Sequence, residues 1–302
     1  MTEEPLANSP VDPSLQPYDS SDSAPTPEFI HAPPRSPNIG HATVFLAFAF
    51  CIIYLVQLIA FTIARHLPSL QALTAQQIIQ IPRFTVLANF SGYLIVLALA
   101  VLLSPLAWDR TFATGIHCNL AAARRNARWL VPLGIALSFA AAAAESLFSI
   151  PKSLPVDRFF ASRIDLWLVT LAGTLLAPAF EEICFRGFLL PAIAISYDWL
   201  RLPRSPEARL RWQTTQNLSP AALAVGAILS SACFAALHGK QLSYTLPPLA
   251  ALFCVSLVLS LVRIRLRSVA ASSLVHASYN GLLFAVTFAQ TSGFRHLENL
   301  HR

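Results

Sequence analysis

The sequence predicts an all-α membrane protein: a polytopic bundle of about seven to eight transmembrane helices behind a disordered N-terminal tail. The composition is the first observation that supports this fold class. Of the 302 residues, 55% are hydrophobic and only 12% carry a charge, whereas about 25% of residues are charged in ordinary soluble domains. The second observation is a series of long apolar stretches, and the third is a polar, Pro-rich start that lacks them.

Seven stretches of the chain approach or exceed the length of about 20 residues that crosses a bilayer as a helix. Helices are expected because lipid offers no hydrogen-bond partner to an unpaired backbone group. In chain order, the stretches lie near 43–64, 84–108, 129–144, 166–196, 219–237, 241–262 and 268–292.

The spans and their polar residues divide the chain into four regions. Residues 1–40 are rich in Pro, Ser and Asp, cannot bury a core, and form the expected disordered tail. Residues 41–160 hold variable N-terminal transmembrane helices without a motif. Residues 161–292 hold all the polar motifs and form the expected catalytic core, and residues 293–302 are a C-terminal tail.

Arginines are concentrated in the predicted loops on one side of the bundle. With seven spans, three loops share a side with the N-terminus. They carry Arg124, Arg125, Arg128, Arg201, Arg204, Arg209, Arg211, Arg263, Arg265 and Arg267. The positive-inside bias places this side in the cytoplasm, and a bacterial inner membrane is the expected location. The net charge of +6 is thereby explained by contact with the lipid bilayer, and no nucleic-acid partner is implied.

Two glutamates and one arginine lie inside the fourth apolar stretch, where a charged side chain costs about 2.5–3.5 kcal/mol. On a helix, Glu182 and Arg186 share a face and suit an ion pair. Glu181 points about 100° away and remains available as a base. A purely structural ion pair is the alternative, but it leaves Glu181 unpaired. Pro178 cannot donate a hydrogen bond and is expected to kink the helix just before the pair.

Two further spans carry histidines. His238 ends the stretch 219–237, where a helix cap or an interface residue is the alternative to a catalyst. His276 and Asn280 share one face of the last span, where a hydrogen-bonded pair between helices is the alternative. Span counting places His238 late and His276 early in parallel helices. We therefore expect that the fifth helix continues past His238 or that the sixth is short and tilted, and Pro247 and Pro248 would permit a break there.

Together these side chains suit a hydrolytic site. A carboxylate can take the proton of a water molecule, an imidazole can relay it, and an amide can stabilise an oxyanion. Glu181, His238 and His276 could instead hold zinc with an open position for water. The chain contains no H-E-x-x-H, G-x-S-x-G or Walker motif, so zincin, serine-hydrolase and nucleotide-binding classes are unsupported.

The three motifs EEICFRGFL, FAALHG and HASYN resemble, in order, those of the CPBP family of intramembrane proteases (CAAX protease and bacteriocin-processing, also called Abi). The resemblance covers roughly residues 165–290. It implies cleavage of a peptide bond in a membrane-associated peptide or protein, either a prenylated CAAX-type or a bacteriocin-like substrate. The segment 201–219 is longer than the family pattern and is expected to form a cytoplasmic hairpin.

The resemblance also implies roles for individual residues. Glu181 would be the general base and His238 its partner. His276 and Asn280 would stabilise the oxyanion or orient the carbonyl, while Glu182 and Arg186 would be the supporting pair. The family has been described as metalloproteases, and both a zinc-dependent and a metal-independent reaction stay open. The competing classes are a non-catalytic bacteriocin-immunity or scaffold protein, and a proton-coupled transporter.

Overall fold

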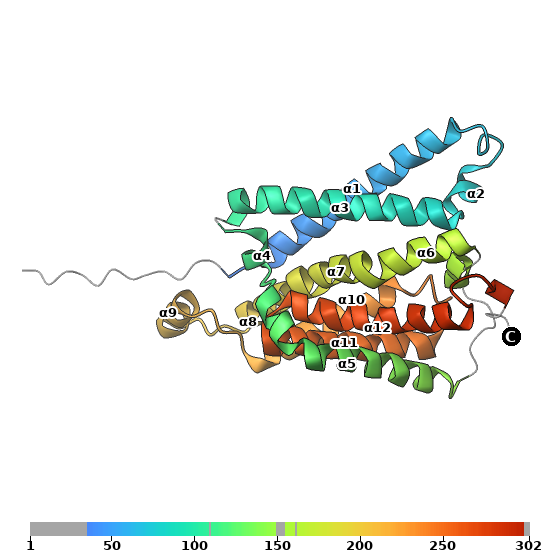
Figure 1. The fold of residues 1–302 in the computed structure, drawn as a ribbon. Helices are drawn as coiled ribbons and strands as arrows, with labels where there is room; N and C mark the ends of the chain where they lie inside the picture. Colours follow the sequence, from blue (N-terminus) through green and yellow to red (C-terminus); the bar gives the residue numbers. More distant parts are fainter. Residues whose placement is uncertain (1–34, 109, 149–154, 161, 299–302) are drawn as a thin grey trace, which may run out of the picture.

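The computed structural model describes residues 35–298 except 109, 149–154 and 161, and these described residues form helices and loops without a strand. Seven helices among them are long and apolar enough to cross a membrane (Figure 1). They are α1 (Ile39–Arg65), α3 (Pro82–Trp108), α5 (Leu120–Glu145), the run from α6 to α8 (Arg163–Leu200), α10 (Pro220–Leu237), α11 (Leu246–Leu266) and α12 (Val269–Gln290). The predicted fold class and order of spans are confirmed.

Residues 1–34 of the predicted tail lie outside the described residues, but the end of that region is part of the fold. Helix α1 begins at Ile39, capped by Asn38, so the expected boundary at 40 is a few residues late. Arg35 donates a hydrogen bond to the carbonyl of Thr215 (2.8 Å) and its guanidinium lies 3.5 Å from the ring centre of Trp212. These contacts join the start of α1 to the segment 201–219.

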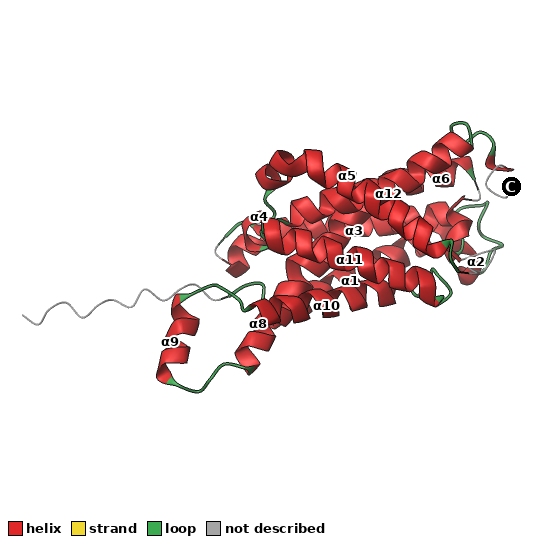
Figure 2. Ribbon diagram, turned by 90° about the horizontal axis from the view of Figure 1, so that it is seen from below, coloured by secondary structure: helices red, strands yellow, loops and turns green. Residues whose placement is uncertain are grey.

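The segment 201–219 carries its own short helix, α9 (Pro206–Thr214), as a projecting hairpin. Figures 1 and 2 both show α9 standing away from the bundle, beyond the end of α8 (Leu190–Leu200). Three other short elements connect spans: α2 (Ala75–Ile79), α4 (Phe112–Gly115) and the 3-10 helix η1 (Pro155–Phe160). The expected hairpin is therefore present.

The bundle has two packed parts (Figure 1). Helices α1 and α3 pack together, and their aromatic rings meet the middle of the α6–α8 run, where Phe45 stacks on Phe188 at 4.0 Å. In the other part, α5 and α12 lie along each other, and α10 packs against both α8 and α11. Gly134 permits the close approach of α5 to α12, since an added Cβ would lie 2.4 Å from the carbonyl oxygen of Val275.

Helix α5 begins earlier than the predicted third span. Asn119 caps it by accepting a hydrogen bond from the amide of Ala122 (2.9 Å), so the first turns contain the arginines predicted to lie in a loop. These are Arg124, Arg125 and Arg128. Arg263 and Arg265 likewise belong to the last turns of α11. An arginine near the end of a transmembrane helix can extend its long side chain to the interface between membrane and water. The helix can therefore continue through these arginines.

The span that carries the acidic pair is not a regular α-helix. Two π-helical segments, η2 (Ala172–Leu176) and η3 (Ile183–Leu189), separate α6 (Arg163–Leu171), α7 (Ala177–Glu182) and α8. Pro178 and Pro191 each follow one of these wide segments within the first turn of the next helix. A proline lacks the amide that the preceding turn requires, and the wide turns take up that interruption. The expected simple kink at Pro178 is replaced by a widened helix.

Both expectations about the fifth and sixth spans are wrong. Helix α10 ends at Leu237, with His238 as its C-cap. Helix α11 is 21 residues long, and Pro247 and Pro248 stand in its first turn, where their missing amides remove no helical hydrogen bond. A different feature must bring His238 and His276 to a common depth.

That feature is an offset between the starts of α10 and α12. Asp198, in the last turn of α8, accepts hydrogen bonds from the amide (2.7 Å) and hydroxyl (2.6 Å) of Ser219, which caps α10. A helix rises about 1.5 Å per residue. Along the α6–α8 run, Asp198 therefore lies about 25 Å from Glu181, whereas along α12 the first residue lies only about 10 Å from His276. Helix α10 therefore starts farther from the level of Glu181 than α12 does. It needs more residues to reach that level, so a histidine at the end of α10 lies at the same depth as one near the start of α12.

Candidate active site

Glu182 and Arg186 form a fully buried ion pair at the centre of the bundle. The Nη1 atom of Arg186 donates to Oε1 of Glu182 at 2.7 Å, and neither side chain is exposed. The same guanidinium donates to the carbonyl (2.7 Å) and hydroxyl (2.6 Å) of Ser256 and to the hydroxyl of Ser260 (3.3 Å). Arg186 thus ties η3 to α11, and the predicted ion pair is confirmed.

His276 connects the two glutamates. Its Nδ1 lies 3.1 Å from Oε1 of Glu182, and its Nε2 lies 3.8 Å from Oε2 of Glu181. A carboxylate only accepts hydrogen bonds, so Nδ1 is assigned the proton that it donates to Glu182. In the tautomer that carries one proton, at Nδ1, the free Nε2 faces Glu181. The buried acid therefore fixes the orientation and tautomer of the imidazole.

Glu181 is the member of the acidic pair that reaches open space. Its side chain is 25% exposed and lines a cavity of about 480 Å³ together with His238, His276 and Asn280. The structure thus brings four of the six predicted site residues to one cavity and leaves Glu182 and Arg186 behind its wall. The free and paired glutamates are those that their helical positions predicted.

His238 and Asn280 reach the cavity but hold other partners. The Nδ1 of His238 lies 2.9 Å from the carbonyl oxygen of Phe234, which leaves Nε2 available. The amide nitrogen of Asn280 donates to the carbonyl of Gly173 in η2 at 2.8 Å; this uses one of its two N–H groups. The rings of both histidines contact Phe234, with centroids 4.7 Å and 5.7 Å away. In the described part of the chain, no hydrogen bond joins His238 directly to Glu181.

The donor set was also tested against a metal ion. No three His, Cys, Asp or Glu side chains among the described residues are placed to hold one. Glu181, His238 and His276 therefore do not form a ready three-ligand zinc site. Each imidazole has one nitrogen engaged, by Phe234 and by Glu182 respectively. Zinc binding stays a prediction.

Three polar contributors to this region were missed from the sequence. Ser256 and Ser260 receive the guanidinium of Arg186, and Glu145, at the end of α5, lines the cavity. The four-residue spacing of the two serines in an apolar span was a usable indication, because small polar residues mark contacts between membrane helices. Nothing local indicates Glu145, since only the packing of α5 on α12 places it there.

The comparison with known families agrees with this geometry. The family model described as "Type II CAAX prenyl endopeptidase Rce1-like" matches residues 163–282. No curated protein and no solved structure matches the chain. The match begins at the first residue of α6 and ends within α12, so it contains all three motifs. Residues 163–282 are thus similar to the Rce1-like family, and the resemblance to the CAAX protease family is confirmed over this part of the chain.

Proposed function

We propose that the protein is an intramembrane endopeptidase of the CAAX type, in which Glu181 activates a water molecule for attack on a peptide bond. One observation carries the proposal: of two adjacent glutamates, one is neutralised by a buried arginine while the other faces a cavity beside a histidine. A purely structural ion pair does not require Glu181. The Rce1-like match over 163–282 supports the same reaction class.

The proposed reaction begins with a water molecule between Glu181 and the substrate carbonyl. Glu181 takes a proton from the water, and the oxygen bonds to the carbonyl carbon to give a tetrahedral intermediate. The second N–H of Asn280 is proposed to stabilise the oxyanion. His238 is proposed to do so when its ring is protonated, because Nε2 then carries a proton that it can donate. When the intermediate collapses, the C–N bond breaks and Glu181 returns its proton to the leaving amine. The products are a carboxylic acid and an amine, which exchange a proton to give a carboxylate and an ammonium group, and the carboxylate of Glu181 is regenerated.

His276 is proposed to act beside Glu181 rather than as a base of its own. With its proton held at Nδ1 by Glu182, its Nε2 can accept a hydrogen bond from the attacking water. The ion pair of Glu182 and Arg186 would then be a support that keeps the imidazole in place. In this proposal Glu181, which faces the cavity, carries out the chemistry, and the buried residues Glu182 and Arg186 hold His276 in position.

The proposed substrate is a membrane-associated peptide or protein, and a prenylated C-terminal tail is the first to test. The cavity suits such a substrate, because aromatic and aliphatic side chains line it around the polar groups, among them Phe234, Leu252 and Phe284. A bacteriocin-like peptide is the alternative. We place the enzyme in a bacterial inner membrane, with the arginine-rich N-terminal side in the cytoplasm.

The decisive experiment compares Glu181→Gln with Glu207→Gln in purified protein. Glu207 is exposed on α9 and does not line the cavity that holds Glu181. We expect Glu181→Gln to abolish cleavage of a panel of prenylated and unprenylated peptides without changing the melting temperature, and Glu207→Gln to cleave normally. Full cleavage by Glu181→Gln would refute the assignment of the base.

The same panel tests the competing functions. A wild-type protein that cleaves no peptide, and whose cellular phenotype survives Glu181→Gln and His276→Ala, would be a non-catalytic immunity or scaffold protein. Substrate-dependent proton flux into liposomes without cleavage would indicate a transporter. Metal analysis of the purified protein, with cleavage measured after chelation and after zinc is restored, decides whether the reaction needs a metal.

A further inference from the structure

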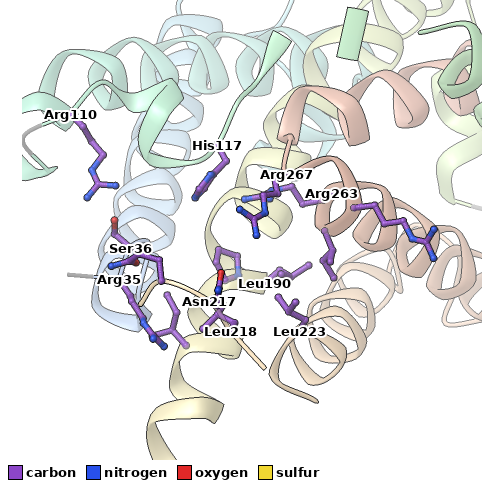
Figure 3. A pocket seen from close by; sticks show the side chains of 15 residues that line it. Arg35, Ser36, Arg110, His117, Leu190, Asn217, Leu218, Leu223, Arg263 and Arg267 are labelled. Atoms are coloured by element: carbon purple, nitrogen blue, oxygen red, sulfur yellow. The ribbon is translucent and has the colours of Figure 1, made fainter. Parts of the chain in front are cut away.

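A second cavity, of about 700 Å³, lies at the opposite end of the bundle from the loop that follows α10. It shares no lining residue with the cavity that holds Glu181. Its wall contains His117 and no acidic side chain. Five arginines also line it: Arg35, Arg110, Arg263, Arg265 and Arg267. Figure 3 shows Arg110, His117, Arg263 and Arg267 on one side of this space, with Arg35 and Asn217 across from them.

Arg263 is the residue that the fold itself does not explain. It is only 8% exposed, and its Nε atom has no hydrogen-bond partner among the described residues. Its hydrogen bond to the described part of the chain is long, at 3.5 Å from Nη2 to the carbonyl oxygen of Ile116. No carboxylate of the described chain forms a salt bridge with it; Asp198, on α8, acts on Arg35 instead. A buried charge without an opposite charge is costly, and this one stands beside other cations.

The backbone holds these cations in place. The amide of Val269 donates to the carbonyl of His117 (3.1 Å), and the hydroxyl of Ser268 donates to the carbonyl of Asn119 (2.8 Å). These bonds join the loop before α5 to the turn between α11 and α12. His117 and Arg267 both adopt left-handed backbone conformations there, with φ of 56° and 46°. Such conformations cost free energy in residues other than glycine, so the surrounding contacts must maintain them.

The electrostatic effect on His117 agrees with this placement. Burial lowers the pKa of His117 first, and the nearby Arg263, Arg267 and Arg110 lower it further. The three guanidinium groups therefore act on one point from three separate elements: the end of α11, the turn after it, and the segment before α4. An anion near His117 would be attracted by all three of them.

We infer that this cavity binds a phosphate group, with Arg263, Arg267 and Arg110 as its main ligands and Arg35 and His117 at its edge. Guanidinium groups match phosphate oxygens with paired, charge-assisted hydrogen bonds. Inorganic phosphate and phosphomonoesters can carry two negative charges and a phosphodiester carries one, and all of them offer several oxygens to converging arginines. The site lies at the arginine-rich end of the spans, where both an anionic lipid headgroup and a soluble phosphate compound can reach it.

The test measures the melting temperature of the full-length protein in neutral, lipid-poor detergent. One arm adds inorganic phosphate, with sodium chloride at equal ionic strength as the control for screening. The other arm transfers the protein to nanodiscs of phosphatidylcholine with or without phosphatidylglycerol. A ligand that binds only the folded state raises the melting temperature. The variant is Arg263→Gln, and the matched control is Arg209→Gln, on an exposed arginine of α9 outside the cavity.

We expect wild type and Arg209→Gln to be stabilised alike, and Arg263→Gln to bind phosphate or the anionic lipid at least about tenfold more weakly. Without anion, Arg263→Gln should melt no lower than wild type, because it removes a buried repulsion. Stabilisation by inorganic phosphate supports a soluble ligand, and stabilisation by phosphatidylglycerol alone supports a lipid headgroup. The inference is overturned if neither anion stabilises wild type, or if Arg209→Gln loses as much as Arg263→Gln. If Arg263→Gln does not fold, Arg267→Gln replaces it in the same comparison.

Discussion

Replacing Arg186 with methionine should be among the most damaging single changes in the chain. The side chain is fully buried and its guanidinium donates four hydrogen bonds, to Glu182, Ser256 and Ser260. Arg186→Met leaves Glu182 as a buried carboxylate without its cation. Breaking a buried pair from one side costs about 3–5 kcal/mol. At about 2–4 °C per kcal/mol, the melting temperature should fall by about 6–20 °C.

The double variant Glu182→Gln/Arg186→Met separates the charge from the packing. It removes both charges, and glutamine can still accept the hydrogen bond from Nδ1 of His276. We expect it to recover most of the lost stability, because the isolated buried charge is gone. The assay is thermal unfolding in detergent micelles, followed by the fluorescence of the native tryptophans. Two results would contradict this reasoning: a loss below about 1 kcal/mol in Arg186→Met, or a double variant that is no more stable than the single one. Either would mean that the unpaired charge of Glu182 is not what destabilises Arg186→Met.

Three further predictions use other parts of the molecule. Gly134→Ala should destabilise the bundle by about 1–3 kcal/mol in thermal unfolding, because the new methyl group would overlap α12. Gly281→Ala should be nearly neutral, because its Cβ would meet only Cγ2 of Thr174, at the ordinary contact distance of 3.5 Å. The pKa of His117 lies below its usual 6.5, so its contribution to the free energy of unfolding is complete above pH 6.5 and is lost as the pH falls below that value. Thermal unfolding measured from pH 8 to 5 should show this loss of stability in wild type and less of it in His117→Gln. Gln241 lies in the loop after α10 and lines the cavity that holds Glu181. With the N-terminal side in the cytoplasm, Gln241→Cys should react in intact cells with a membrane-impermeant thiol reagent, and Arg204→Cys should react only after lysis. The reverse pattern would overturn this orientation.

The sequence was sufficient for the spans and for the paired and free glutamates, since both depend on local properties. A helix that must cross lipid needs about 20 apolar residues, and residues four apart on a helix meet regardless of the rest of the fold. For the same reason Glu181 could be separated from Glu182 without coordinates. The ends of helices were less accessible: α5 begins at Leu120 because Asn119 caps it, nine residues before the apolar stretch begins.

The remaining parts of the site depend on tertiary contacts that no local pattern encodes. The common depth of His238 and His276 depends on where α10 begins beside the end of α8, which the hydrogen bonds between Asp198 and Ser219 mark; these bonds join two different helices. The partner of Asn280 is a carbonyl of a π-helical turn, and a proline indicates an interrupted helix without specifying how the turn is rebuilt. The arginine cavity combines segments more than 200 residues apart, so its converging charge is visible only in three dimensions.

The π-helical segment Ala172–Leu176 gives this span an uneven tolerance to changes in chain length. A wide turn accommodates an additional residue without rotating the helix that follows it. A one-residue deletion there can be absorbed by rewinding to ordinary α-helix, at the expense of the contact between Gly173 and Asn280. The same deletion inside Ala177–Glu182 cannot be taken up by a wide turn, because this segment is ordinary α-helix. It would rotate the side chains on one side of the deletion by about 100° relative to those on the other side. Homologous chains should therefore differ in length on the Ala172 side of Ala177 more readily than between Ala177 and Glu182.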